Sequence, residues 1–168
     1  MKYKIIIVLL SLLFTLFSFT PQFLDLYERP KVPADRDFEL VHNYMFDYNF
    51  YLSRIRQGME GRWLVTEKYY NHPHPPSLFQ IIYLYFGKIG GVFSMSPPFV
   101  YHLMRLGFGT ALLILIGLWA GRIFSGWWRV VAYLFAVTAG SWPIIIKLEN
   151  GSFRSATYMG WWSAIDSL

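Results

Sequence analysis

An uncharged segment behind the first two lysines sets the main constraint on the fold of this chain. After Lys2 and Lys4, the residues from Ile5 to Leu24 carry no charge. About 20 mostly apolar residues are enough to cross a bilayer as a helix. No small-residue cleavage site follows, which favours an uncleaved anchor over a signal peptide. The sequence therefore predicts an N-terminal transmembrane anchor over residues 1–24.

The acidic residues gather directly behind this anchor. Eight of the ten lie between Asp25 and Glu67, and the other two are Glu149 and Asp166. Any chemistry that needs carboxylates is therefore expected in this polar loop or at the far end of the chain.

The composition is that of an integral membrane protein. Hydrophobic residues make up 55% of the chain and charged residues only 15%, against about 25% charged in soluble domains. Between Asp25 and Lys68, eight acidic residues face seven basic ones, so the net charge of +5 arises elsewhere. Positive charge at membrane edges indicates topology and lipid contact. The bilayer is thus the expected partner, and nucleic acid is not.

Two further apolar runs, Pro98–Gly121 and Val130–Ile146, predict a second and a third span. Arg122 and Arg129 flank paired tryptophans between them, which is typical of a cytoplasmic turn. We expect an all-α fold with about three transmembrane helices, a cytoplasmic N-terminus and a helical outer loop over 25–97. Residues 98–146 would form the two later spans in the cell membrane. Residues 147–168 would begin a second outer loop of a truncated chain.

The segment Ser77–Phe93 leaves one alternative open. Its apolar core is about ten residues long, a length more typical of interfacial or re-entrant helices. If it spanned the bilayer, Arg122 and Arg129 would lie outside. We expect it not to span.

The outer loop contains one helical pattern, which begins at Tyr44. Apolar side chains recur at spacings of four, three and four, at Tyr48, Leu52, Ile55 and Met59. This spacing predicts an amphipathic helix, expected to lie on the membrane surface. Arg54, Arg56, Gln57 and Glu60 fall off the stripe, and Gly58 and Gly61 are expected to end the helix.

Asp47 is the leading candidate for a catalytic residue, because it lies at the start of this helix. A carboxylate there could serve as a general base beside a lipid-borne phosphate, and Arg54 could clamp that phosphate. The alternative is that Asp47 only caps the helix. His72 and His74 suggest a metal site weakly, because cysteine is absent and solvated turns are common. No metal ligand is assigned, although a divalent cation is possible.

Two other positions belong to the candidate set. Arg105 lies one turn after His102 in the second span and could contact lipid headgroups or a substrate phosphate. Asp166 follows an aromatic segment and could pair with Glu149 as an outer acid/base or metal-binding constellation. Ordinary interfacial polarity is the alternative for both acids.

The string F-D-Y-N-F-Y-L-S-R-I-R-Q-G-M-E-G-R-W, with G-W-W-S-A-I-D-S-L near the end, resembles the outer-loop motifs of GT-C-type glycosyltransferases. These include oligosaccharyltransferase catalytic subunits, protein mannosyltransferases and aminoarabinose transferases. The resemblance implies catalytic roles for Asp47 and Asp166, and substrate binding by Tyr51, Arg54 and Arg105. It implies transfer of a sugar from a polyprenyl-phosphate donor to an extracytoplasmic acceptor.

The chain is shorter than such enzymes, so we expect it to be their N-terminal portion. The main alternative is a non-enzymatic membrane anchoring or assembly protein whose loop docks a partner. A transporter fragment is disfavoured, because transport sites lie near the midplane and these acids lie in loops.

Overall fold

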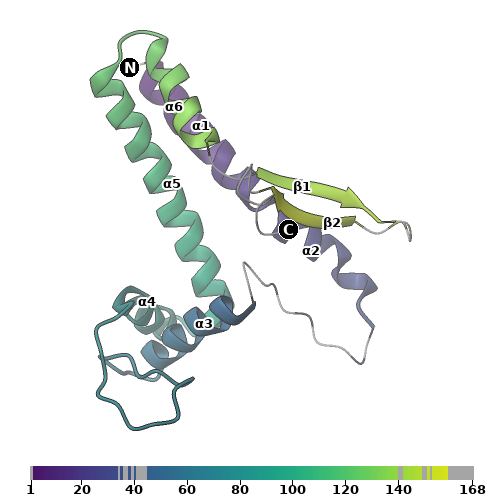
Figure 1. The fold of residues 1–168 in the computed structure, drawn as a ribbon, viewed down its shortest axis with the longest axis vertical. Helices are drawn as coiled ribbons and strands as arrows, with labels where there is room; N and C mark the ends of the chain where they lie inside the picture. Colours follow the sequence, from purple (N-terminus) through teal and green to yellow (C-terminus); the bar gives the residue numbers. More distant parts are fainter. Residues whose placement is uncertain are drawn as a thin grey trace, which may run out of the picture. The chain divides into compact units, whose positions relative to one another are not determined.

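A computed structural model describes residues 2–33, 35, 38, 40, 45–139, 142–148, 151 and 153–158. Its elements, in chain order, are the helices α1 (Lys2–Ser18) and α2 (Thr20–Glu28), a 3₁₀ turn η1 (Arg29–Lys31), the helices α3 (Met45–Met59), α4 (Ile81–Val92), α5 (Pro97–Ile123) and α6 (Trp128–Thr138), and the strands β1 (Trp142–Lys147) and β2 (Phe153–Tyr158) (Figure 1). They form two compact units, one over Val41–Gly107 and one over the remaining residues.

The second predicted span is confirmed as a helix. α5 has 27 residues, contains an 18-residue stretch with a mean hydropathy of 1.8, and is long and apolar enough to cross a membrane. It contains the whole of the predicted segment Pro98–Gly121. The short helix α4, with 12 residues, lies within the predicted interfacial segment.

The predicted anchor is bent. α1 and α2 meet at an angle of 42° and reach spanning length only as a pair. Pro21 explains the break, because proline has no N–H to continue the helical ladder. The Thr20 hydroxyl donates instead to the Phe17 carbonyl, at 2.6 Å. By length and composition, the described part of the chain therefore holds one membrane-crossing helix, or two if this bent pair counts as one span.

The third predicted span is not a single helix. α6 ends at Thr138 after 11 residues, and residues 142–147 form strand β1 instead. β1 pairs antiparallel with β2, with Trp142 opposite Tyr158 and Lys147 opposite Phe153. Pro143 cannot continue a helix, and the isoleucine run beside it favours extended backbone. The described residues are therefore mainly helical, in line with the all-α prediction, but they also contain this two-stranded sheet, which the sequence did not predict.

In the unit over residues 41–107, α3 packs on α4 with close backbone contact (Figure 1). A side chain at Gly58 would overlap the Leu84 carbonyl, and one at Gly87 would overlap the Ile55 carbonyl. Glycine is therefore required where the two helices approach. α3 ends at Met59, between Gly58 and Gly61, as the sequence predicts.

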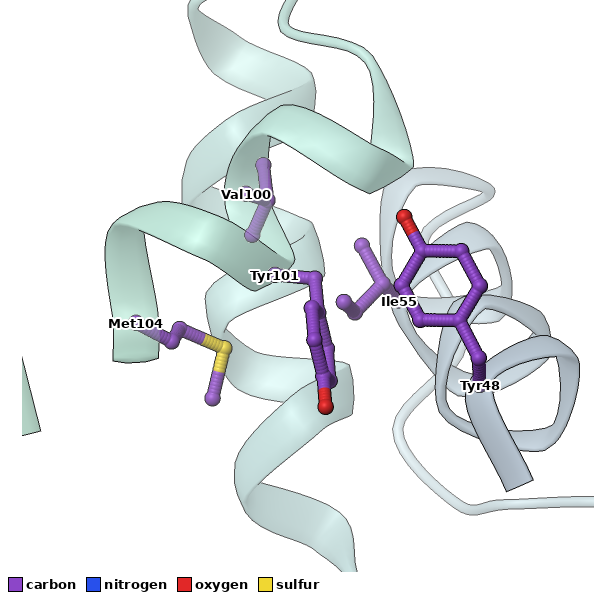
Figure 2. Close-up of a cluster of buried hydrophobic side chains, with 5 residues drawn as sticks. All are labelled: Tyr48, Ile55, Val100, Tyr101 and Met104. Atoms are coloured by element: carbon purple, nitrogen blue, oxygen red, sulfur yellow. The ribbon is translucent and has the colours of Figure 1, made fainter. Parts of the chain in front are cut away.

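The first turns of α5 complete the core of this unit. Figure 2 shows Val100, Tyr101 and Met104 of α5 gathered with Tyr48 and Ile55 of α3. Tyr48 and Ile55 are fully buried, so the predicted apolar stripe is present. The stripe was expected to lie on the membrane surface, but in the structure it packs against α4 and α5.

The other unit has its own small core of Ile7, Ala120 and Tyr133. Two hydroxyl contacts accompany it. Ser11 Oγ lies 2.8 Å from Tyr133 Oη, and Thr110 donates to Thr15 at 3.1 Å. Polar contacts of this kind hold apolar helices together when few alternatives for hydrogen bonding exist.

Candidate functional site

A cavity of about 410 Å³ lies beside α3 in the unit over residues 41–107. Three of its lining residues come from successive positions on one face of the helix, namely Asp47, Phe50 and Tyr51. The others, Glu67, Tyr69 and Gln80, come from the segment between α3 and α4. Spacings of three and four place helical side chains on one face, so α3 presents a carboxylate next to two aromatic rings.

Asp47 lies in the first turn of α3 and is exposed. Because α3 begins at Met45, Asp47 is the third residue of the helix and not its N-cap, contrary to the alternative interpretation. An acidic residue at this position is still stabilised by the helix dipole. Its place in the cavity lining means that its carboxylate can reach a bound molecule.

Tyr51 joins the cavity to a stack of aromatic rings. Its ring lies 4.8 Å from that of Tyr83 and 6.0 Å from that of Tyr101, centroid to centroid, with both pairs stacked. Burial, with a smaller contribution from Tyr51, raises the pKa of Tyr83. Packing on two partners fixes the position of Tyr51 at the cavity wall.

Arg54 lies in a different environment from the one the sequence pattern predicts. It is 2% exposed, not on a solvated face. Its Nη2 donates to Glu67 Oε2 at 2.6 Å, and its Nη1 donates to the Phe50 carbonyl at 3.0 Å. The guanidinium carbon lies 3.1 Å from the centroid of the Phe50 ring. Arg54 is thus committed to holding Glu67 and Phe50, both of which line the cavity.

Gln57, also expected on the solvated face, is fully buried and anchors the segment after α3. Its Nε2 donates to the Thr66 carbonyl at 2.9 Å, and its Oε1 accepts from the Thr66 N–H at 2.8 Å. Val65 and Ser77 exchange two backbone hydrogen bonds of 2.9 Å. The contacts of Gln57 with Thr66 and the backbone bridge between Val65 and Ser77 thus hold the chain on either side of Glu67 in place.

Gln80 and Tyr69 are site residues that the sequence did not indicate. Gln80 precedes α4 with a φ of 56°, a left-handed conformation that is unusual outside glycine. Backbone strain of this kind often accompanies functional positions. Tyr69 stacks on Phe50 with 6.3 Å between ring centroids. No sequence pattern marks either residue, because both reach the cavity through the course of the loop.

His74 is engaged by the backbone. Its Nε2 lies 3.0 Å from the Glu67 carbonyl and its Nδ1 lies 3.1 Å from the Pro75 carbonyl. These two carbonyls, that of Glu67 first, raise the pKa of His74. Within the described ranges, no group of three His, Asp or Glu residues could hold a metal ion. The residues that the structure describes therefore do not by themselves fit a divalent cation.

The remaining predicted site residues lie elsewhere. Arg105 is half-buried in α5, where its Nη1 lies 3.2 Å from His102 Nδ1. It is not among the residues that line the cavity. Asp166 lies outside the described residues. Of the predicted site residues, Asp47 and Tyr51 line the cavity. Arg54 does not line it, but it pairs with Glu67, which does.

Comparison with known protein families, with curated protein sequences and with solved structures finds no match to this chain.

Proposed function

We propose that this chain is the N-terminal module of a membrane glycosyltransferase that moves a sugar from a polyprenyl-phosphate donor to an extracytoplasmic acceptor. The observation that carries the proposal is the position of Asp47. Its exposed carboxylate lines a cavity of about 410 Å³ in the same compact unit as the first turns of the apolar helix α5. The resemblance of the sequence around Asp47 to GT-C-type enzymes names the reaction class.

In this proposal Asp47 is the catalytic base. Its carboxylate accepts the proton of the acceptor nucleophile while the bond between the sugar and the carrier phosphate breaks. A base that is positioned in this way typically contributes 10²- to 10⁴-fold to the rate. Tyr51 forms part of the wall against which the acceptor rests. Asp166 assists from the second outer loop, and no step is assigned to a metal ion.

Arg105 is the better candidate of the two arginines for the carrier phosphate. The Arg54 guanidinium is 2% exposed and already paired with Glu67. An arginine aimed at a leaving phosphate stabilises the charge that develops there. Arg54 then contributes indirectly, by holding Glu67 and Phe50 in the cavity wall. The donor reaches the site through the bilayer, because a polyprenyl chain is soluble only there.

The test is sugar transfer by membranes that contain the full gene product with the substitution Asp47→Asn. The variant should lose about 100-fold or more in rate at normal expression, because the amide cannot accept the proton. Asp35→Asn is the matched control, since Asp35 is exposed and does not line the cavity. Turnover by Asp47→Asn equal to that of the control would remove Asp47 from the mechanism.

A further inference from the structure

The polar groups in the wall of the Asp47 cavity are rich in hydrogen-bond acceptors. Asp47 and Glu67 contribute carboxylates. Gln80 adds an uncharged amide side chain. Ionised carboxylates only accept hydrogen bonds. The wall therefore suits a ligand that donates hydrogen bonds.

The charge of the cavity wall points in the same direction. Among the described residues, no lysine or arginine lines the cavity. The Arg54 guanidinium pairs with Glu67 Oε2 at 2.6 Å, and the Tyr69 N–H donates to Glu67 Oε1 at 3.3 Å. Because Arg54 offsets the charge of Glu67, the exposed carboxylate of Asp47 leaves the described wall negative. A phosphate would be repelled there, whereas a cation would be attracted.

The rest of the wall is aromatic, with the rings of Phe50, Tyr51 and Tyr69. A cation next to an aromatic face is stabilised by the negative charge of that face, and ammonium ligands are recognised in this way. The Phe50 ring already contacts the Arg54 guanidinium, at 3.1 Å, and stacks on Tyr69, so Tyr51 and Tyr69 are the rings that remain for a ligand. Carboxylates and rings together favour a positive ligand over a neutral one.

We propose that this cavity binds the part of the acceptor that carries a protonated amine beside its hydroxyl groups. The ammonium donates hydrogen bonds to the carboxylates of Asp47 and Glu67, and it rests against the aromatic rings. This inference rests on the proposed function and adds the chemical class of the acceptor. It also implies that the carrier phosphate binds outside this cavity.

Three monosaccharides serve as probes for the full chain in detergent micelles, namely glucosamine, glucose and glucose 6-phosphate. Saturation-transfer NMR at pH 6, where the amine of glucosamine is protonated, measures the affinity of each. Glucosamine should bind about fivefold more tightly than glucose, a difference of about 1 kcal/mol, and glucose 6-phosphate should bind more weakly than both. Equal affinities of glucosamine and glucose, or tighter binding of the phosphate, would overturn the proposal.

Variants then locate the site. Asp47→Asn should remove the preference for glucosamine, and Asp35→Asn should keep it. Glu67→Gln should reduce the preference, with Glu60→Gln as its control, because Glu60 is exposed and outside the cavity. Circular dichroism shows whether each variant is folded. A preference that survives Asp47→Asn refutes the assignment to this cavity.

The two proposals can fail separately. If Asp47→Asn loses sugar transfer while the intact chain shows no preference for glucosamine, the transferase stands and the acceptor class is wrong. If the preference depends on Asp47 while transfer does not, the binding site stands without the enzyme.

Discussion

Replacing Gly58 by alanine sets two physical effects of opposite sign against each other. Alanine favours the helix interior over glycine by about 1 kcal/mol, so local propensity predicts a more stable protein. The structure predicts the opposite, because the new methyl group would overlap the Leu84 carbonyl of α4. The obstacle is backbone, which cannot rotate away as a flexible side chain can.

The magnitude follows from the cost of overfilling a packed contact. Such substitutions typically destabilise by about 1–3 kcal/mol, and an overlap with backbone belongs at the upper end of this range. After subtraction of the gain in propensity, Gly58→Ala should lower the free energy of unfolding by about 1–2 kcal/mol. For a unit of this size, about 4–8 °C per kcal/mol applies, so Tm should fall by about 4–16 °C.

The assay is thermal unfolding in detergent, followed by circular dichroism, with two companion variants. Gly107→Ala is the control, because Gly107 is helical and nothing lies within 4 Å of the added methyl group; its Tm should stay or rise. The Tm of Gly87→Ala should fall as that of Gly58→Ala does, because the added methyl group would overlap the Ile55 carbonyl. The double variant should lose less than the sum, since the helices need to separate only once.

A Tm of Gly58→Ala equal to or above that of the intact chain would refute this reasoning. It would mean that α3 and α4 do not approach as closely as described, and that Gly58 only weakens the helix.

Two further predictions concern the segment that positions Glu67. Gln57→Leu should cost about 1–2 kcal/mol, because it leaves the half-buried Thr66 N–H and carbonyl without their partners at 2.8 and 2.9 Å. Limited proteolysis should then cut near Thr66, and unchanged protection would contradict the anchoring role. His74 should make this segment pH-dependent. Carbonyls only accept, so both contacts of His74, with Glu67 and Pro75, are hydrogen bonds only when both ring nitrogens carry protons. Because these carbonyls raise the pKa of His74 in the folded state, its stabilising contribution is complete below the unfolded pKa and is lost as pH rises through the folded pKa. Hydrogen exchange of residues 67–75 should therefore be slower at pH 5.5 than at pH 8 after correction for intrinsic rates, and His74→Phe should abolish the difference.

Local pattern predicted the helices whose periodicity or length is unambiguous. The apolar run behind Pro98 appears as α5, and the stripe through Tyr48 and Ile55 appears as the buried face of α3. Both predictions needed only the helical repeat and the length of a bilayer-crossing segment. The run Val130–Ile146 failed as one helix because hydropathy does not distinguish a helix from a strand, while Pro143 and its isoleucines do.

The site was only partly visible in the sequence. Asp47 could be selected from its place at the start of a short helix, and Tyr51 from the resemblance of the surrounding string to GT-C-type enzymes. The pairing of Arg54 with Glu67 could not be foreseen, since thirteen positions separate the two residues and an irregular loop lies between them. Gln80 joins the same cavity only because that loop returns to the start of α4.

The sequence alone determined the long apolar helix α5, the acid-rich segment behind the first apolar run and the apolar stripe of α3, because hydropathy and the helical repeat are properties of neighbouring residues. The tertiary structure decided which charged groups face a cavity and which are paired with other residues inside the protein. Arg54 is the clearest case: a helical wheel places it among solvated residues, and the return of the loop over α3 buries it at 2% exposure against Glu67. Whether a charged side chain faces a ligand or pairs with a neighbour depends on contacts between segments that are distant in the sequence. Local sequence patterns carry no information about such contacts.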